Sequence, residues 1–131
     1  MKILIDTQIF LWATLDRRLP GHIRSLIDDP DSEIYLSTAS AWEISIKYSK
    51  GKLPLPEHPR TFISKTVAAT DIKLLPITFR HSVNVTELPH YHKDPFDRLL
   101  VVQANESKMS LISVDENIKK YDVDIIDFTP E

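Results

Sequence analysis

The sequence predicts an α/β domain, in which a central parallel sheet of about five strands carries helices on both faces. Short apolar runs alternate along the chain with longer segments whose apolar residues recur at helical spacing, the pattern of parallel strands joined by helical crossovers. The chain has 131 residues, 42% hydrophobic and 27% charged, which suits one core and a single domain over residues 1–131. Ligands of such sheets bind beyond the carboxyl ends of the strands, where the strand order reverses.

The first quarter of the chain predicts two strands that flank two helices. KILI, residues 2–5, is an apolar run that an acid stops, which is typical of a buried strand. TQIFLWATL, residues 7–15, has a helical apolar face, and a Pro-Gly pair separates it from a second short helix over residues 21–29. EIYLS, residues 33–37, predicts the second strand.

The second quarter predicts a helix, a proline-rich connection, another helix and a strand. Apolar residues alternate in AWEISIKY, as in a strand, but the length of the segment, its Ser/Thr start and Gly51 as a C-terminal cap favour a helix over residues 37–50. After LPLPEHP, the segment RTFISKTVAA, residues 60–69, has helical spacing, and DIKLLPI, residues 71–77, predicts the third strand.

The remaining third continues the alternation of helix and strand. TFRHSVNVTEL predicts a helix over residues 78–88, and PFDRLLVVQANESK predicts one over residues 95–108 with a single buried face. MSLISV, residues 109–114, and DIIDF, residues 124–128, predict the last two strands. DENIKKY, residues 115–121, predicts a short helix between them.

Composition excludes several classes of site. With only two glycines, Gly21 and Gly51, neither a dinucleotide-binding turn nor a P-loop can be present. The absence of cysteine excludes disulfides, thiolate zinc sites and cysteine nucleophiles, and fits a cytoplasmic protein. No apolar run is long enough to span a membrane, and an acid at position 6 argues against a signal peptide.

Charge is unevenly distributed along the chain. Residues 47–80, here called the basic segment, contain seven Lys or Arg against two acids, a net charge of +5, whereas the rest of the chain carries −8. One interpretation is ordinary solvated helix faces. The other is a basic arm beside an acidic centre.

Five acids are candidates for a functional site, and each also has a structural interpretation. Asp6 and Asp115 follow predicted strands, but both could cap the helices they precede. Glu43 lies between large apolar residues, where glutamate is seldom buried unpaired, although it could face solvent. Asp94 precedes a proline suited to the first helical turn, which predicts an N-cap, while Asp97 could interact with the helix dipole or do chemistry.

Taken together, these acids predict a cation site. Carboxylates gathered at strand ends and helix starts of one small domain repel each other unless cations neutralise them. Oxygen ligands without thiolates select hard ions, Mg²⁺ or Mn²⁺. None of the five histidines has zinc-binding spacing on a helix, and His90 and His92 are interpreted as loop residues at the surface, with a substrate contact as the alternative.

Four segments resemble the PIN-domain ribonucleases, in particular the VapC-type toxins of bacterial and archaeal toxin–antitoxin pairs. The segments are ILIDTQIFLW, STASAWEISIK, HYHKDPFDRLLVVQA and LISVDENIKKY, and D-P-F-D-R-L-L is the most specific part. The resemblance implies a PIN-like three-layer fold. It also implies a catalytic, metal-binding site formed by four acids with Thr7 and Ser113 as supporting hydroxyls. These four acids, here called the four-acid cluster, are Asp6, Glu43, Asp97 and Asp115.

The same resemblance implies an activity and partners. The expected reaction is Mg²⁺-dependent hydrolysis of single-stranded RNA that leaves 5′-phosphate and 3′-hydroxyl ends. The expected assembly is a homodimer bound to a small VapB-like antitoxin. The residues expected to hold the RNA backbone are Lys47, Lys50, Lys52 and Arg98.

Two other classes of function stay open at this stage. One is a catalytically silent module that binds RNA or acts as a scaffold, although the intact acids argue against it. The other is a phosphoryl-accepting regulatory α/β domain. Such domains have an acid pair after the first strand, whereas here Asp6 is followed by Thr7 and Gln8.

Overall fold

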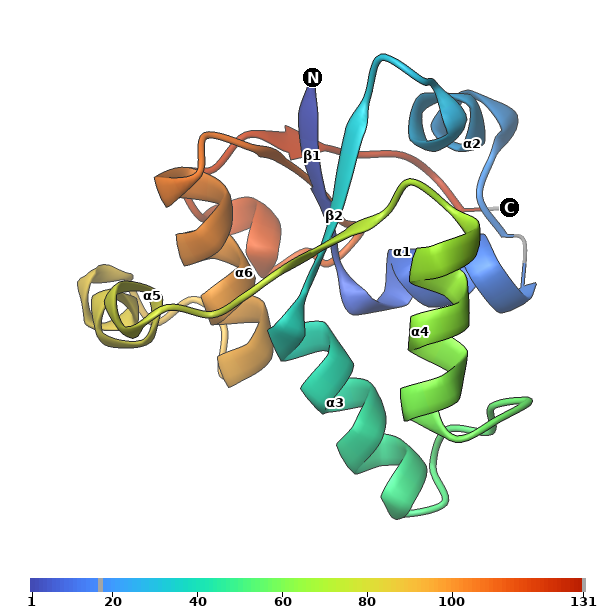
Figure 1. The fold of residues 1–131 in the computed structure, drawn as a ribbon. Coiled ribbons are helices and arrows are strands. Elements are labelled where there is room, and N and C mark those ends of the chain that lie inside the picture. Colours follow the sequence, from blue (N-terminus) through green and yellow to red (C-terminus); the bar gives the residue numbers. More distant parts are fainter. Residues whose placement is uncertain (17, 131) are drawn as a thin grey trace.

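The protein forms an open, twisted parallel sheet between two sets of helices (Figure 1). The computed structural model describes residues 1–16 and 18–130. All strand pairs are parallel and the strand order is β3-β2-β1-β4-β5, which confirms the predicted fold class. The strands are β1 Lys2–Ile5, β2 Glu33–Ser37, β3 Lys73–Leu75, β4 Ser110–Ile112 and β5 Ile125–Ile126.

Six α-helices lie within the described residues. They are α1 Thr7–Leu11, α2 Gly21–Asp28, α3 Thr38–Ser49, α4 Pro59–Ala69, α5 Phe79–Asn84 and α6 Pro95–Glu106. In Figure 1, α5 and α6 lie on one side of the strands, and α1, α2 and α4 lie on the other. None of the described helices combines the length and the apolar character that a membrane crossing requires.

Side-chain alternation along β1 divides the core into two layers. Ile3 and Ile5 point into the cluster formed with α1, α2, α3 and α4, whereas Leu4 points into a second cluster formed mainly with α6. All three side chains are fully buried, so β1 is covered on both faces. This explains why KILI is a continuous apolar run instead of an alternating one.

The topology places a switch point at the carboxyl end of β1. From β1 the sheet continues through β2 to β3 on one side, while β4 and β5 lie on the other side. Asp6 directly follows β1, and Asp115 lies three residues beyond the end of β4, its neighbour in the sheet. Both acids therefore lie at the edge where such sheets bind ligands.

Several element boundaries differ from those predicted. The helix expected over residues 7–15 is α1 followed by a π-helical turn at Trp12–Asp16, and the strands after β2 are shorter than their apolar runs. The helix expected over residues 115–121 is wrong, because only a 3₁₀ turn forms at Ile118–Lys120. The Asp115 carboxylate accepts hydrogen bonds from the main-chain nitrogens of Asn117 and Ile118, as a cap does, and the turn that it starts ends at Lys120.

Candidate metal centre

A polar pocket of about 470 Å³ opens at the carboxyl ends of β1 and β4, and the four-acid cluster lines it. Each acid comes from a different part of the chain: Asp6 from the end of β1, Glu43 from α3, Asp97 from α6 and Asp115 from the loop after β4. Asp94, Lys47 and Lys52 also line this pocket. The fold thus brings together all five acids that the sequence singled out.

Asp6 is a buried carboxylate at the start of α1. It is 5% exposed and accepts a hydrogen bond of 2.8 Å from the main-chain nitrogen of Ile9, so it caps the helix as well as lining the pocket. Burial raises its pKa from 3.8 to about 6. Hydrogen bonds from the Ser113 hydroxyl and from Ile9 oppose the rise, and the charges of Asp115 and Glu43 add to it.

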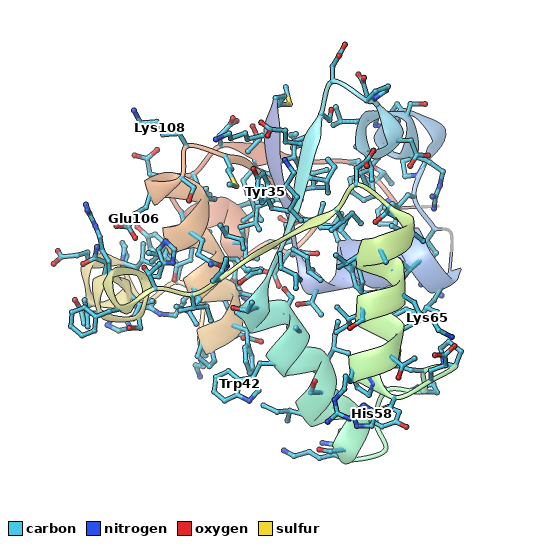
Figure 2. All side chains as sticks on the ribbon, in the orientation of Figure 1. Tyr35, Trp42, His58, Lys65, Glu106 and Lys108 are labelled. Atoms are coloured by element: carbon cyan, nitrogen blue, oxygen red, sulfur yellow. The ribbon has the colours of Figure 1, made fainter. Side chains whose placement is uncertain are left out.

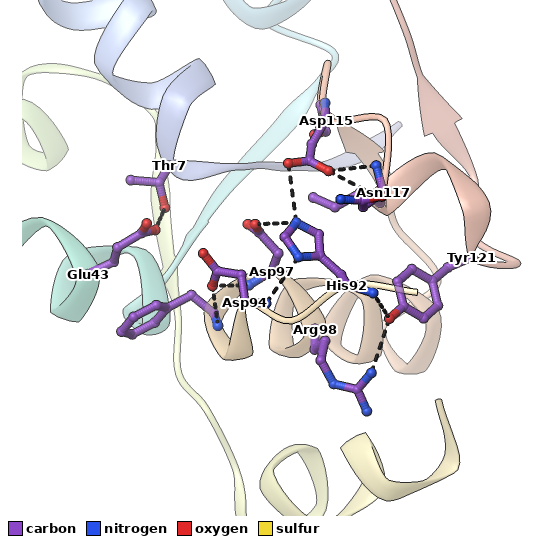
Figure 3. Close-up of polar contacts among 12 residues, drawn as sticks. Thr7, Glu43, His92, Asp94, Asp97, Arg98, Asp115, Asn117 and Tyr121 are labelled. Carbon is purple, nitrogen blue, oxygen red and sulfur yellow. Dashed lines mark hydrogen bonds and ion pairs between the residues drawn. The ribbon is translucent and has the colours of Figure 1, made fainter. Parts of the chain in front are cut away.

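Glu43 is buried, not solvent-facing. It is 7% exposed, and hydrogen bonds hold both of its carboxylate oxygens; Figure 3 shows the one from Thr7. The Thr7 hydroxyl donates to Oε1 at 2.6 Å, and the Lys47 ammonium donates to Oε2 at 2.8 Å. Because Lys47 lies one turn further along α3, the pair has favourable helical spacing.

A pair of aromatic rings joins the helix of Glu43 to the helix of Asp97. Trp42 and Phe96, each adjacent in sequence to one of these acids, pack edge to face with ring centroids 5.3 Å apart. Trp42 lies at the surface between α3 and the start of α6 (Figure 2), and 59% of it is exposed. The contact packs the start of α6 against α3 beside the pocket.

Asp94 and Asp97 have the distinct positions that the sequence predicted. The Asp94 carboxylate accepts hydrogen bonds from the main-chain nitrogens of Phe96 and Asp97, at 2.8 and 3.3 Å, with Pro95 in the first turn, which confirms the N-cap. Asp97 lines the pocket as Asp94 does, but it is not the capping residue. Burial raises its pKa from 3.8 to about 8, helped by the charges of Asp94 and of the other three acids of the cluster.

Asp115 is the acid with the most donors. Its Oδ1 accepts from Asn117 and Ile118 at 2.8 and 3.0 Å, and its main-chain nitrogen donates to the Ser113 hydroxyl at 3.1 Å. Burial alone raises the pKa of Asp115, but hydrogen bonds from Ile118 and the His92 ring outweigh it, and the net pKa is lowered. Ser113 itself is fully buried beneath the pocket.

The sequence did not identify His92 as part of this site. Its Nε2 lies 3.0 Å from Asp97 Oδ2 and 3.2 Å from Asp115 Oδ2, and the potential ligand atoms of the three residues lie within 4.8 Å of one another. The side chain is 13% exposed, so the surface interpretation is wrong for His92. Its position two residues before the Asp94 cap was the one available signal, and a loop histidine at that position is not specific.

The four basic residues expected to contact RNA lie in different surroundings. Lys52 lines the pocket, Lys47 is paired with Glu43, and Lys50 is exposed at the end of α3. Arg98 points away from the pocket: its guanidinium donates to the carbonyl oxygens of Pro89 and Val85, both at 2.9 Å, and to the hydroxyl of Tyr121. Their role in RNA binding stays a prediction.

The donor set of the pocket fits a hard divalent cation. Every acid offers carboxylate oxygen, and the chain has no thiolate that would favour a softer metal. The pKa values of Asp6 and Asp97 are raised first by burial and further by the charges of the neighbouring carboxylates. A bound cation would offset the repulsion between these carboxylates.

Fold and site together define the class of protein: a parallel α/β domain with a carboxylate centre at its switch point. The chain belongs to the PIN domain family, whose model matches residues 3–124. Among curated proteins, it is 34% identical over 61 residues to Ribonuclease VapC16 of Mycobacterium tuberculosis. That match covers 47% of this chain and 43% of the relative, so the chain aligns with less than half of the relative's length.

Solved structures share the fold over nearly the whole chain. VapBC2 from Rickettsia felis, bound to a DNA fragment from its promoter, superposes with a TM-score of 0.74 at 12% identity, covering 98% of this chain and all of that chain. DNA-bound VapBC from Salmonella typhimurium gives a TM-score of 0.72 at 15% identity, covering 97% and 98%. At these identities the likeness concerns the fold.

Proposed function

We propose that the protein is a metal-dependent endoribonuclease that hydrolyses phosphodiester bonds of single-stranded RNA. The observation that carries the proposal is the convergence of four carboxylates from four separate parts of the chain on one pocket. The membership of the chain in the PIN domain family and its partial match to a ribonuclease support the same reaction.

Asp6, Glu43, Asp97 and Asp115 would hold Mg²⁺ or Mn²⁺. When bound, such a cation lowers the pKa of a water ligand and stabilises charge on the leaving oxygen. The protein's own part is to hold the carboxylates in place and to manage their protons. With pKa values of about 6 and about 8, Asp6 is partly protonated and Asp97 mostly protonated near neutral pH before a cation binds, so binding should release protons.

Lysines beside the pocket would hold the RNA backbone. Lys52 lines the pocket wall, and the rest of the basic segment extends from the end of α3. Contacts to phosphates give affinity and orientation but no choice of base. Selection of a particular RNA would depend on other contacts.

The direct test is cleavage of a labelled single-stranded RNA by the purified protein, with Mg²⁺ and with EDTA. We expect cleavage only with the cation, with 5′-phosphate and 3′-hydroxyl product ends, and no cleavage by Asp6→Asn. A protein that binds this RNA without cutting it would instead be a silent RNA-binding module. Phosphorylation of an acid by a small phosphodonor, without RNA cleavage, would favour a regulatory domain.

We further propose that this nuclease is the toxin of a type II toxin–antitoxin pair that acts in the cytoplasm. Support comes from the structural neighbours, which include VapBC and FitAB complexes. The expected partner is a small VapB-like antitoxin, and the expected assembly is a homodimer. Apolar side chains for a protein contact are present on α5, where Phe79 is 82% exposed and Val83 is 42% exposed.

Co-expression tests the toxin assignment. We expect the protein alone to arrest growth, and a short reading frame next to its own to relieve the arrest and to co-purify with it. Growth that continues while the protein accumulates in active form would contradict the assignment and leave the nuclease activity intact.

A further inference from the structure

His92 lies at the centre of a connected set of hydrogen bonds beside the four-acid cluster (Figure 3). Its ring nitrogen Nε2 is 3.0 Å from Asp97 Oδ2 and 3.2 Å from Asp115 Oδ2. The other ring nitrogen, Nδ1, accepts a hydrogen bond of 3.0 Å from the main-chain N–H of Asp94. The main-chain N–H of His92 donates to the Tyr121 hydroxyl at 3.1 Å.

The contact at Nδ1 fixes where the ring carries its hydrogen. A ring nitrogen that accepts an N–H is unprotonated, and the neutral imidazole then has its hydrogen on the opposite nitrogen. Since Nδ1 accepts from Asp94, the hydrogen of His92 is on Nε2 and is donated to Asp115 Oδ2, with Asp97 Oδ2 3.0 Å from the same nitrogen. A metal ligand at Nε2 would need a free lone pair there. That would place a hydrogen on Nδ1 directly opposite the Asp94 N–H.

This hydrogen bond completes the orientation of Asp115. Its Oδ1 is already occupied by two main-chain donors, and His92 holds its Oδ2. Asp97 Oδ2 lies 3.0 Å from the same ring nitrogen, a close polar contact that places the imidazole between the two carboxylates. Donors that orient carboxylates in this way commonly determine the affinity of a metal site.

The position of His92 is itself supported from behind. The Tyr121 hydroxyl that accepts its main-chain N–H also accepts from Arg98 at 3.1 Å, and Arg98 is tied to the carbonyl oxygens of Pro89 and Val85. Tyr121 is 5% exposed and packs against the ring of Tyr91. The loop before α6 is therefore held at both the ring and the main chain of His92.

We infer that His92 is a positioning residue that donates its Nε2–H to Asp115, lies against Asp97 and holds these two carboxylates for cation binding, without ligating the cation itself. The inference rests on the metal site of the proposed function but not on RNA cleavage. A failure of RNA cleavage therefore leaves it standing.

The hydrogen position can be measured by ¹⁵N NMR of the imidazoles at pH 7.5, with the His92 signals assigned by their loss in His92→Gln. We expect a protonated Nε2 and an unprotonated Nδ1 in the cation-free protein, and the same pattern after addition of Mg²⁺. An unprotonated Nε2 with Mg²⁺ bound would make His92 a ligand and overturn the inference. A hydrogen on Nδ1 in the cation-free protein would overturn it even if no cation binds.

Calorimetry with Mn²⁺ tests the consequence for the site. His92→Leu, which removes the donor, is expected to weaken binding by about 10- to 100-fold, the range found for such orienting partners. His92→Gln, which can place an N–H at a similar reach, should recover most of the loss, and Tyr121→Phe should give an intermediate loss. His90→Leu, a change of the exposed histidine two residues away, is the matched control and should bind like the native protein.

Each outcome of these binding measurements supports or contradicts a positioning role for His92. Native affinity in His92→Leu would make the histidine a bystander, and an equally large loss in His92→Gln and His92→Leu would favour direct ligation. If His92→Leu does not fold, the comparison of His92→Gln with Tyr121→Phe and the ring spectra still test the inference.

Discussion

Replacement of Asp97 by asparagine is expected to stabilise the protein in the absence of divalent cations. Burial and neighbouring carboxylates raise the pKa of Asp97 from 3.8 to about 8. In the unfolded chain the carboxyl group ionises at its ordinary pKa, so folding at neutral pH requires uptake of a proton or burial of a charge beside like charges. Asparagine has the same shape, carries no charge and keeps an oxygen that can accept from His92.

The size of the effect follows from the same values. At about 1.4 kcal/mol per pKa unit, the interval between the ordinary pKa of 3.8 and pH 7 corresponds to about 4 kcal/mol. The side chain keeps 18% of its exposure, so water screens part of this cost, and asparagine makes a weaker hydrogen bond than a carboxylate. We expect a gain of about 2 kcal/mol in the free energy of unfolding, and a rise of about 7 °C in the midpoint of thermal unfolding.

The gain should depend on pH in a defined way. A carboxyl whose pKa is higher in the folded state contributes stability that is complete below its unfolded pKa, and this stability is lost as the pH rises to the folded pKa. For Asp97 the window runs from 3.8 to about 8. The advantage of Asp97→Asn over the native protein should therefore grow across this window and stay constant above it.

Urea unfolding in EDTA at several pH values measures this difference, and Asp71→Asn, a change of an exposed acid outside the pocket, is the control. Addition of Mg²⁺ should then stabilise the native protein more than Asp97→Asn, because a ligand stabilises the fold according to its affinity. Equal shifts by Mg²⁺ in both proteins, or a gain independent of pH, would refute the mutual repulsion of the clustered acids.

Three further predictions concern activity and assembly. Alanine at any position of the four-acid cluster should abolish Mg²⁺-dependent RNA cleavage. Asp94→Ala should remain active and lose about 1 kcal/mol of stability, because the helix cap is removed. A stable, inactive Asp94→Ala beside an active Asp97→Ala would reverse the two roles. Replacement of Lys50 and Lys52 by Gln should make the slope of log affinity for RNA against log salt concentration, measured with Ca²⁺, shallower by roughly 0.7 for each phosphate that the protein no longer binds. Lys2→Gln, at the opposite end of β1, is the control and should leave the slope unchanged. Sedimentation of the isolated protein should show a homodimer, and a monomer at all concentrations would contradict that assembly.

Local sequence predicted the fold best where burial and capping agree. The first two strands match their predicted ranges, Lys2–Ile5 and Glu33–Ser37, because each has an apolar centre and runs into the residue that caps the next helix, Asp6 or Ser37. The ambiguous segment after them is helical, as Gly51 indicated: its φ of 69° is the left-handed conformation that ends a helix readily only at glycine. The glycine cap thus indicated correctly that this segment is a helix and not a strand.

The parts that sequence did not predict depend on contacts between distant residues. His92 has partners at Asp97, Asp115 and Tyr121, the last of them 29 positions away, and no local spacing indicates such contacts. After Asp115, whose carboxylate accepts from Asn117 and Ile118 as a cap does, only a short 3₁₀ turn follows, and the local sequence did not indicate that it would end so soon. For Glu43, sequence could only suggest an unusual burial, and the Thr7 hydroxyl that explains it is a tertiary contact.

The donors available to each acid explain why the cluster is uneven. Asp115 has three donors to its carboxylate and a lowered pKa, whereas Asp6 has its helix N–H and the Ser113 hydroxyl, and a pKa of about 6. The His92 N–H goes to Asp115, with Asp97 Oδ2 3.0 Å from the same nitrogen, and the pKa of Asp97 is the highest of the three, at about 8. A cation supplies positive charge. Its binding should therefore be most favourable beside the acid whose carboxylate accepts the fewest hydrogen bonds from the protein. Asp97 is therefore the acid at which cation binding, proton release and stability should be most tightly linked.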